Sequence, residues 1–263
     1  MRPILPFVLM VSLFGIAQAG PAPAKNGKKA AHAAEQHEKG HWSYSGHGGP
    51  AHWAELDPAF AACGIGRQQS PINIETAFAQ SLDRLQIRYQ PNKLAILNNG
   101  HTIQHPVEPG SHLEIGKNRY QLLQFHFHAP SEEAIGGKRY AMDIHLVHKN
   151  DAGQLAVLTV LIEQGKKDHP TFNELWHSMP GNDETRIFEK KRYSPANVLP
   201  ADLSYWTFMG SLTTPPCSEG VRWLVLKTPI QLSKKQIDRF RRLYPMNARP
   251  VQPLNERAVL DAQ

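Results

Sequence analysis

The sequence predicts a β-dominated α+β protein, a single domain built on a large, mostly antiparallel central β-sheet with short peripheral helices. Apolar residues alternate with polar ones at Leu85, Ile87 and Tyr89, as expected for a strand whose two faces differ in environment. Residues 155–162 and 222–226 are more continuously apolar, and prolines and glycines closely punctuate these runs. This pattern favours short strands joined by turns.

Helix signals are few. Residues 233–236 form a capping box, in which a serine and a glutamine three residues later each accept a hydrogen bond from the other's backbone amide. Pro245 predicts the end of the helix that follows. A second capping box at residues 171–174 predicts a short helix up to Met179.

The composition of the 263 residues excludes several classes of protein. With 41% hydrophobic and 20% charged residues, the chain is typical of a globular protein and not of a disordered, collagenous or polytopic membrane protein. Its net charge of +6 is scattered and not gathered in a basic stripe, which argues against nucleic acid as a partner. Two cysteines are too few for a cysteine-rich zinc ribbon, whereas fourteen histidines leave metal chemistry open.

The N-terminus has the features of an export signal. Arg2 precedes an apolar run over residues 4–16, and residues 17–19 (Ala-Gln-Ala) offer a cleavage site of small residues. The run is short for a membrane span, and a buried first helix is the alternative. A lead-in without large apolar side chains follows, which cannot offset its ordering entropy by burial. We therefore predict a periplasmic protein without stable membrane insertion, with a signal peptide over 1–19, a flexible lead-in over 20–40 and a domain over 41–263.

Export makes the two cysteines informative. In an oxidising compartment with no competing thiol, Cys63 and Cys217 are expected to form one disulfide. Two free thiols are the alternative. Closing so long a loop would stabilise the fold by about 2–5 kcal/mol.

A pair of histidines on one predicted strand can share a metal ion. Residues 124–128 are Gln-Phe-His-Phe-His, so His126 and His128 project from one face while the two phenylalanines project from the other. A cross-strand hydrogen-bonding pair is the alternative explanation of these two histidines.

A third histidine lies on a second alternating segment. Residues 142–148 place Asp143, His145 and Val147 on one face and His148 on the other, where it belongs to the core. If this segment pairs beside the first, His145 completes a three-histidine site. Three neutral imidazoles suit zinc, with the fourth tetrahedral position open to water.

Eight motifs in order carry a resemblance to a known family. They are residues 41–44 (HWSY), 69–74 (QSPINI), 98–101 (NNGH), 124–128 (QFHFH), 131–132 (SE), 143–148 (DIHLVH), 210–216 (GSLTTPP) and 247–253 (NARPVQP). Together they resemble the motifs of the α-class carbonic anhydrases, of the bacterial exported type. The resemblance extends over nearly all of the chain from His41.

The resemblance implies a zinc enzyme. Its catalytic domain would be residues 41–263, and His126, His128 and His145 would bind a catalytic Zn²⁺. The implied reaction is the reversible hydration of carbon dioxide to bicarbonate and a proton, by attack of zinc-bound hydroxide. Carbon dioxide and bicarbonate are then the partners of the site.

The resemblance also implies roles for side chains around the metal. Because an ionised carboxylate can only accept hydrogen bonds, Glu132 would accept from the Thr213 hydroxyl, whose oxygen would in turn accept from the hydroxide. Thr214 would contact bicarbonate. An apolar wall for carbon dioxide, for which plain core packing is the alternative, would comprise Val147, Val157, Leu212, Val221 and Trp223.

The resemblance implies that His101 is the proton shuttle, and an unperturbed imidazole pKa near 6.5 suits that task. A turn histidine is the alternative. Tyr44, Asn99 and Gln104 match positions that order the connecting waters, and Gln124 matches a hydrogen-bond partner of a ligand histidine.

Two residues depart from the family's pattern. Asp143 occupies the position of a hydrogen-bond partner of a ligand histidine, where the family usually carries Glu. Glu133 stands where His commonly follows the Ser-Glu pair. Because Asp is one methylene shorter than Glu, its bond to His145 is expected to lengthen or to run through water.

An inactive carbonic anhydrase-like protein that binds zinc or a partner is the alternative function. Such a protein should lack a ligand histidine or the threonine gate, and both are present here. A periplasmic metal chaperone would use the histidines of the lead-in, which are sparse and irregularly spaced. A monomer and a weak homodimer both fit the sequence.

Overall fold

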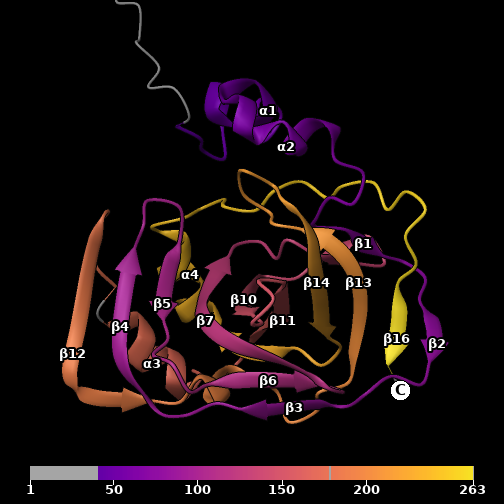
Figure 1. The fold of residues 1–263 in the computed structure, drawn as a ribbon. Coiled ribbons are helices and arrows are strands. Elements are labelled where there is room, and N and C mark those ends of the chain that lie inside the picture. The colour runs from indigo at the N-terminus through magenta and orange to yellow at the C-terminus, as the bar shows by residue number, and fades with distance from the viewer. Residues whose placement is uncertain (1–40, 178, 263) are drawn as a thin grey trace, which may run out of the picture. The chain divides into compact units, whose positions relative to one another are not determined.

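A computed structural model describes residues 41–177 and 179–262 (Figure 1). The predicted signal peptide and lead-in lie outside the described residues. Within these residues, thirteen strands form one mixed sheet and three form a small second sheet. Together with a few short helices, this architecture confirms the predicted fold class.

The bounds of the elements follow the expected short runs. The strands of the large sheet are β2 (Phe78–Gln80), β3 (Leu85–Arg88), β4 (Asn92–Asn98), β5 (Ile103–Pro106), β6 (His112–Ile115), β7 (Asn118–His128), β10 (Met142–Lys149), β11 (Leu155–Gly165), β12 (Glu184–Tyr193), β13 (Tyr205–Ser211), β14 (Glu219–Leu226), β15 (Ile230–Ser233) and β16 (Leu260–Ala262). The small sheet comprises β1 (Asn73–Ile74), β8 (Ala134–Ile135) and β9 (Lys138–Arg139). The helices are α1 (Trp53–Leu56), α2 (Ala62–Ile65), α3 (Pro170–His177) and α4 (Lys234–Arg241), with 3-10 turns η1 (Gly46–Gly48), η2 (Pro58–Phe60) and η3 (Pro195–Val198).

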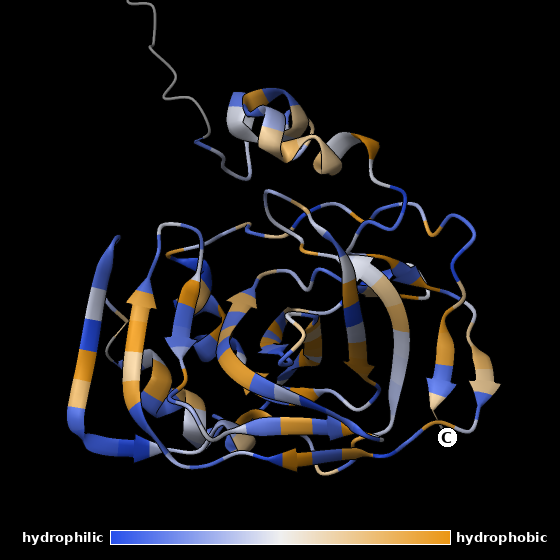
Figure 2. Ribbon diagram, viewed as in Figure 1, coloured by the Kyte–Doolittle hydropathy of each residue, from blue (hydrophilic) through white to orange (hydrophobic). Residues whose placement is uncertain are grey.

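The large sheet runs in the order β12-β4-β5-β7-β10-β11-β14-β13-β16-β2, and β7, β10 and β11 lie at its centre (Figure 1). Antiparallel pairing predominates, but β11 is parallel to both β14 and β15, and β16 is parallel to β2. The edge strand β12 is mostly hydrophilic in Figure 2, whereas its neighbour β4 is mostly hydrophobic. No helix of the described residues is long and apolar enough to cross a membrane.

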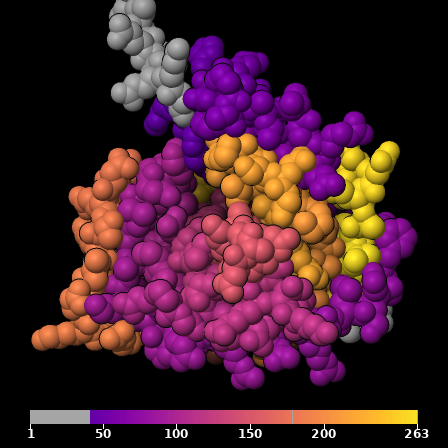
Figure 3. Space-filling view, viewed as in Figure 1, coloured from indigo at the N-terminus to yellow at the C-terminus, as the bar shows by residue number. Residues whose placement is uncertain are grey.

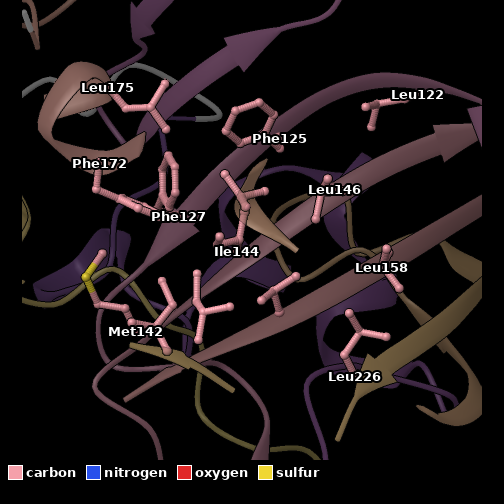
Figure 4. Packing of buried hydrophobic residues seen from close by; sticks show 14 of the residues in the cluster. Leu122, Phe125, Phe127, Met142, Ile144, Leu146, Leu158, Phe172, Leu175 and Leu226 are labelled. Atoms are coloured by element: carbon pink, nitrogen blue, oxygen red, sulfur yellow. The ribbon is translucent and has the colours of Figure 1, made fainter. Parts of the chain in front are cut away.

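The two faces of the sheet bury different residues. On one face, Phe125, Phe127 and Ile144 join a large core with side chains of α3 such as Phe172 (Figure 4). On the other face a second core forms around Trp223. Strand β11 contributes to both cores, because Leu158 and Val160 belong to the first and Val157 and Leu161 to the second. This position between two cores explains its nearly continuous apolar sequence.

One of the two predicted capping boxes is present. At the start of α4, Ser233 Oγ accepts from the Gln236 amide and Gln236 Oε1 accepts from the Ser233 amide, both at 3.2 Å. The prediction of a second capping box at residues 171–174 is wrong. Helix α3 begins at Pro170, so Thr171 lies inside the first turn and its hydroxyl donates to the Asn197 carbonyl. The reason is that proline suits the first position of a helix.

The disulfide between Cys63 and Cys217 is present, which confirms the predicted pairing. It joins α2 to the loop between β13 and β14 across 154 residues of sequence. Figure 3 shows the indigo atoms of the N-terminal part directly against the orange atoms of the chain beyond residue 200. The bridge therefore ties a segment with little sheet pairing of its own to the central sheet.

Replacing both cysteines by serine is expected to lower the free energy of unfolding by about 2–5 kcal/mol, because the bridge restricts the unfolded chain over a long loop. Chemical denaturation of the variant and of the parent, with and without reductant, measures the difference. Thiol labelling of the denatured, unreduced parent should find no free cysteine. Two labelled thiols, or equal stability of variant and parent, would contradict this prediction.

Candidate active site

The register of two central strands brings the three predicted ligand histidines together. Strand β10 pairs antiparallel with β7, so that His145 lies directly opposite His126, and Asp143 opposite His128. The ring centroids of the three histidines are 4.6–5.4 Å apart. One ring nitrogen of each lies within 4.8 Å of those of the other two. This spacing suits a single shared metal ion.

Each imidazole is oriented from behind by an oxygen atom. His126 Nδ1 lies 2.9 Å from Gln124 Oε1, and His128 Nδ1 lies 2.7 Å from the carbonyl oxygen of Asn247. His145 Nε2 lies 3.3 Å from Glu133 Oε2. When these nitrogens donate, the opposite nitrogen of each ring keeps its lone pair for a metal.

The residues present fit a zinc ion. His128 Nε2 is buried and has no hydrogen-bond partner among the described residues, although an imidazole nitrogen in that position normally has one. Burial lowers the pKa of His126 well below its usual value, and the two neighbouring imidazoles lower it further, which favours the neutral form. A set of three imidazole nitrogens is a donor set that suits zinc.

Two buried carboxylates lie beside His145. Burial alone would lower the pKa of His145, but the carboxylates of Asp143 and Glu133 outweigh burial and raise it. For Asp143, burial acts to raise the pKa of the carboxyl, and the opposing attraction of His145 brings it below its usual value. Burial raises the pKa of Glu133 to about 7.

Glu132 is fully buried and held at both ends. Its Oε1 accepts from the backbone amide of Arg249 at 2.7 Å, and its own amide donates to Asp143 Oδ2 at 2.7 Å. Its Oε2 lies 3.5 Å from His128 Nε2 and has no hydrogen-bond partner among the described residues. Thr213 is buried in the loop that follows β13, and its hydrogen bond to Glu132 stays a prediction.

Close packing fixes the start of the loop that carries Thr213. Ser211 Oγ accepts from the Ser70 amide at 2.9 Å, and the Ser211 carbonyl accepts from Trp223 Nε1 at 3.0 Å. At Gly210 a Cβ atom would lie 2.1 Å from Ser70 Oγ, so only glycine permits this approach. These contacts therefore fix the backbone at the end of β13, where the loop that carries Thr213 begins.

Arg249 and Asn247 contact candidate site residues and were not predicted from the sequence. The buried Arg249 guanidinium donates to Gln69 Oε1 and to the Ser70 carbonyl, both at 2.8 Å, and to the Cys63 carbonyl at 2.9 Å. The available signal was the motif at residues 247–253, which contains both residues. Arginine is rarely buried, and Asn247 orients His128 through its backbone oxygen, so the side-chain types gave no hint.

The predicted apolar wall lies beside the histidines. Val157, Val221 and Trp223 are buried in the second core, and Val147 and Leu212 pack against it. The Trp223 ring centroid is 4.9 Å from that of His145, edge to face. Core packing and a substrate wall are therefore compatible here.

His101 occupies a turn at the rim of the sheet, between β4 and β5. Asn99 Oδ1 accepts from the amides of His101 and Thr102, at 3.0 and 2.9 Å, which shapes the turn. The half-buried His101 ring stacks on Trp42 with centroids 3.7 Å apart, and lies 6.4 Å from the ring of His41. The imidazole is thus held by stacking at the edge of the described domain.

Of the remaining predicted polar residues, Gln104 lies beside a ligand histidine, Tyr44 near Glu132 and Thr214 in the loop after β13. Gln104 lies on β5 directly opposite His126. Burial raises the pKa of the Tyr44 hydroxyl, and the carboxylate of Glu132 raises it further, so the phenol stays protonated. The Thr214 carbonyl accepts from the Cys217 amide at 2.8 Å, which closes a turn after Thr213.

Comparison with known proteins shows to which family this chain belongs. The family described as eukaryotic-type carbonic anhydrase matches residues 48–263. The chain belongs to this family. A carbonic anhydrase of Nostoc sp. is 45% identical over 227 residues, which cover 84% of this chain and 86% of that protein. One from Klebsiella pneumoniae is 45% identical over 224 residues, covering 84% of this chain and 91% of that protein.

Solved structures of α-carbonic anhydrases have the same fold as this chain. The α-carbonic anhydrase from Thermovibrio ammonificans, in complex with the inhibitor sulfanilamide, matches with a TM-score of 0.81 at 41% identity, covering 84% of this chain and 99% of that chain. The α-carbonic anhydrase of Photobacterium profundum matches with a TM-score of 0.80 at 40% identity, covering 84% and 100%. The large sheet with few short helices is therefore the fold of α-carbonic anhydrases.

The surroundings of His101 predict how its pKa responds to substitution. Burial lowers the pKa of His101, the neighbouring His41 lowers it further, and the carboxylate of Asp183 opposes both. His41→Gln removes a group of like charge and is expected to raise this pKa. Asp183→Asn removes a group of opposite charge and is expected to lower it.

NMR titration of the His101 ring measures these shifts. His52→Gln serves as the control, because His52 contacts Glu55 and the ring of His47 and not His101. Shifts of the opposite sign in the His41 and Asp183 variants, or an equal shift in the control, would contradict the prediction.

Proposed function

We propose that this protein catalyses the zinc-dependent, reversible hydration of carbon dioxide to bicarbonate and a proton. The observation that carries the proposal is the group of three imidazoles, each with one nitrogen held by an oxygen from behind and the other close to its two counterparts. Membership of the carbonic anhydrase family supports it. So do curated relatives named carbonic anhydrase, at 45% identity.

The three histidines would hold the metal ion. His126 and His128 would coordinate through Nε2 and His145 through Nδ1, since their other nitrogens are engaged. When bound, zinc supplies the Lewis acidity that makes water a nucleophile at neutral pH. Because the three ligands are neutral imidazoles, they leave the charge of the ion undiminished.

Glu132 and Thr213 would orient the nucleophile. Glu132 Oε1 accepts from the Arg249 amide, whereas Oε2 has no partner among the described residues and would accept the Thr213 hydroxyl hydrogen. With its hydrogen directed there, the Thr213 oxygen can only accept. It would therefore take a hydrogen bond from the attacking oxygen and turn a lone pair of that oxygen toward carbon dioxide.

The apolar wall would receive the substrate. Carbon dioxide is weakly hydrated, and the surface of Val147, Val157, Leu212, Val221 and Trp223 can contact it without leaving a polar group unsatisfied. Thr214, half-exposed beside Thr213, would donate to the bicarbonate product. Product can then leave into water.

Proton transfer would use His101. Its ring lies half-buried at the rim and its depressed pKa favours release of a proton to solvent. Tyr44, Asn99 and Gln104 would order the waters that connect it to the centre. Stacking on Trp42 holds the ring at the rim, where it would receive the proton.

Export to the periplasm is part of the proposal. The N-terminal charge and apolar run predict a cleavable signal peptide. The Cys63–Cys217 disulfide and the bacterial relatives support an oxidising location. We propose a monomer or a weak homodimer that acts on carbon dioxide and bicarbonate without a nucleic-acid partner.

Removal of one ligand tests the metal centre. His145→Ala is expected to abolish carbon dioxide hydration and to reduce bound zinc, because two imidazoles and water bind the ion more weakly than three imidazoles. Stopped-flow hydration assays and metal analysis measure both. His52→Ala, an exposed histidine outside the site, is the control. Undiminished hydration by the His145 variant would refute the mechanism.

Removal of the proton shuttle tests the second step. His101→Ala is expected to slow turnover by about 10²-fold at low buffer concentration, because a general acid–base group is lost. Imidazole buffer should restore part of kcat, since it replaces the missing proton acceptor. Stopped-flow kinetics at increasing imidazole concentration measure the recovery. A variant with parental kcat in dilute buffer would exclude His101 from proton transfer.

A further inference from the structure

Two carboxylates compete for a single hydrogen on His145. Its Nε2 lies 3.3 Å from Glu133 Oε2 and 3.4 Å from Asp143 Oδ2. A neutral imidazole that binds a metal through Nδ1 carries one hydrogen on Nε2, so it can form one well-directed hydrogen bond. The distances alone do not separate the two acceptors, but their other contacts do.

Asp143 already has a shorter hydrogen bond. The oxygen that lies nearest His145, Oδ2, accepts from the Glu132 amide at 2.7 Å. That bond directs the carboxylate toward the backbone of the segment that carries Glu132. Asp143 is therefore mainly engaged in placing Glu132.

Glu133 has no such engagement. Among the described residues, the hydrogen bond of its Oε2 is the one to His145, and its Oε1 is buried without a partner. A fully buried carboxylate is costly unless it is paired. His145 is thus the group that compensates for the burial of Glu133.

The backbone around Glu133 is rigid enough to aim the side chain. Ser131 Oγ donates to the Glu133 carbonyl at 2.7 Å and accepts from the Tyr140 amide at 2.9 Å. Directly after Glu133, the Ala134 amide donates to the Ile72 carbonyl where β8 pairs with β1. The small second sheet therefore fixes the direction from which Glu133 reaches His145.

We infer that Glu133 is the positioning residue for the ligand His145, while Asp143 positions the backbone of Glu132. The inference rests on the proposed zinc-binding function of His145. It links the two departures from the family's pattern, because Glu133 takes the hydrogen of His145 Nε2 while Asp143, 3.4 Å from the same nitrogen, accepts from the Glu132 amide. Partners of this kind typically change metal affinity by about 10–100-fold when removed.

The test measures zinc release and not turnover. Glu133→Leu removes the acceptor at similar volume and is expected to speed zinc release to a chelator by about 10–100-fold. Glu133→Gln keeps an amide oxygen and should release zinc at an intermediate rate. Asp143→Asn is expected to change the release rate less than Glu133→Leu, because its oxygen can still accept from the Glu132 amide.

A matched control exists elsewhere on the sheet. Glu114 lies 3.3 Å from the ring of His112, a carboxylate–histidine pair outside the site, so Glu114→Leu should leave zinc release unchanged. The thermal midpoint of the metal-free protein separates positioning from a merely structural role. Glu133→Gln, which keeps the shape and an acceptor oxygen, should leave that midpoint near the parental value while zinc release is faster, whereas a merely structural role predicts that the two change together.

The outcomes distinguish this inference from the proposed function. If the parent protein binds no zinc, the proposed function fails. If the parent binds zinc and both Glu133 variants release it at the parental rate, the proposed function stands and the assignment of Glu133 is overturned. Fast release from Asp143→Asn with parental release from Glu133→Gln would also overturn it. Because Gln nearly matches Glu in shape, this comparison remains decisive even if the Leu variant fails to fold.

Discussion

The pairing register between β7 and β10 is the constraint on which the site depends. It places His145 directly opposite His126. A slip of one residue would turn every side chain of β10 to the other face. Such a slip would move Ile144 out of the large core and bury His145 among the phenylalanines of β7. The apolar contacts of one face therefore secure the position of the imidazoles on the other.

Buried charged residues surround the histidines. Glu132, Glu133, Asp143 and Arg249 are each at most 1% exposed. Groups of this kind are tolerated only when hydrogen bonds replace their lost hydration. Backbone amides supply much of this compensation for the acids, and backbone carbonyls do so for Arg249. Because Arg249 contacts both Glu132 and the Cys63 carbonyl, the disulfide-linked segment and the Glu132 carboxylate share one support.

Local pattern predicted the faces of the strands but not their distant supports. Alternation alone identified which side His126 and His128 occupy, because a strand has a period of two. It could not identify the Asn247 carbonyl behind His128, since a backbone acceptor 119 residues away has no side-chain signature. The failed capping box shows the same limit at short range. There Pro170 determined where the helix begins, and Thr171 bonded to a distant carbonyl instead.

The exchange between Asp143 and Glu133 shows why a conservative-looking substitution must be interpreted with its neighbours. Shortening a carboxylate by one methylene would normally leave its histidine without a close acceptor. Here the freed direction is filled by a second carboxylate from the segment that already carries Glu132, so His145 Nε2 keeps an acceptor. The price is a second buried acid beside the first, and burial raises the pKa of Glu133 to about 7. Within the described residues, His145 is the group that makes this second acid tolerable, because it is the hydrogen-bond partner of Glu133 Oε2.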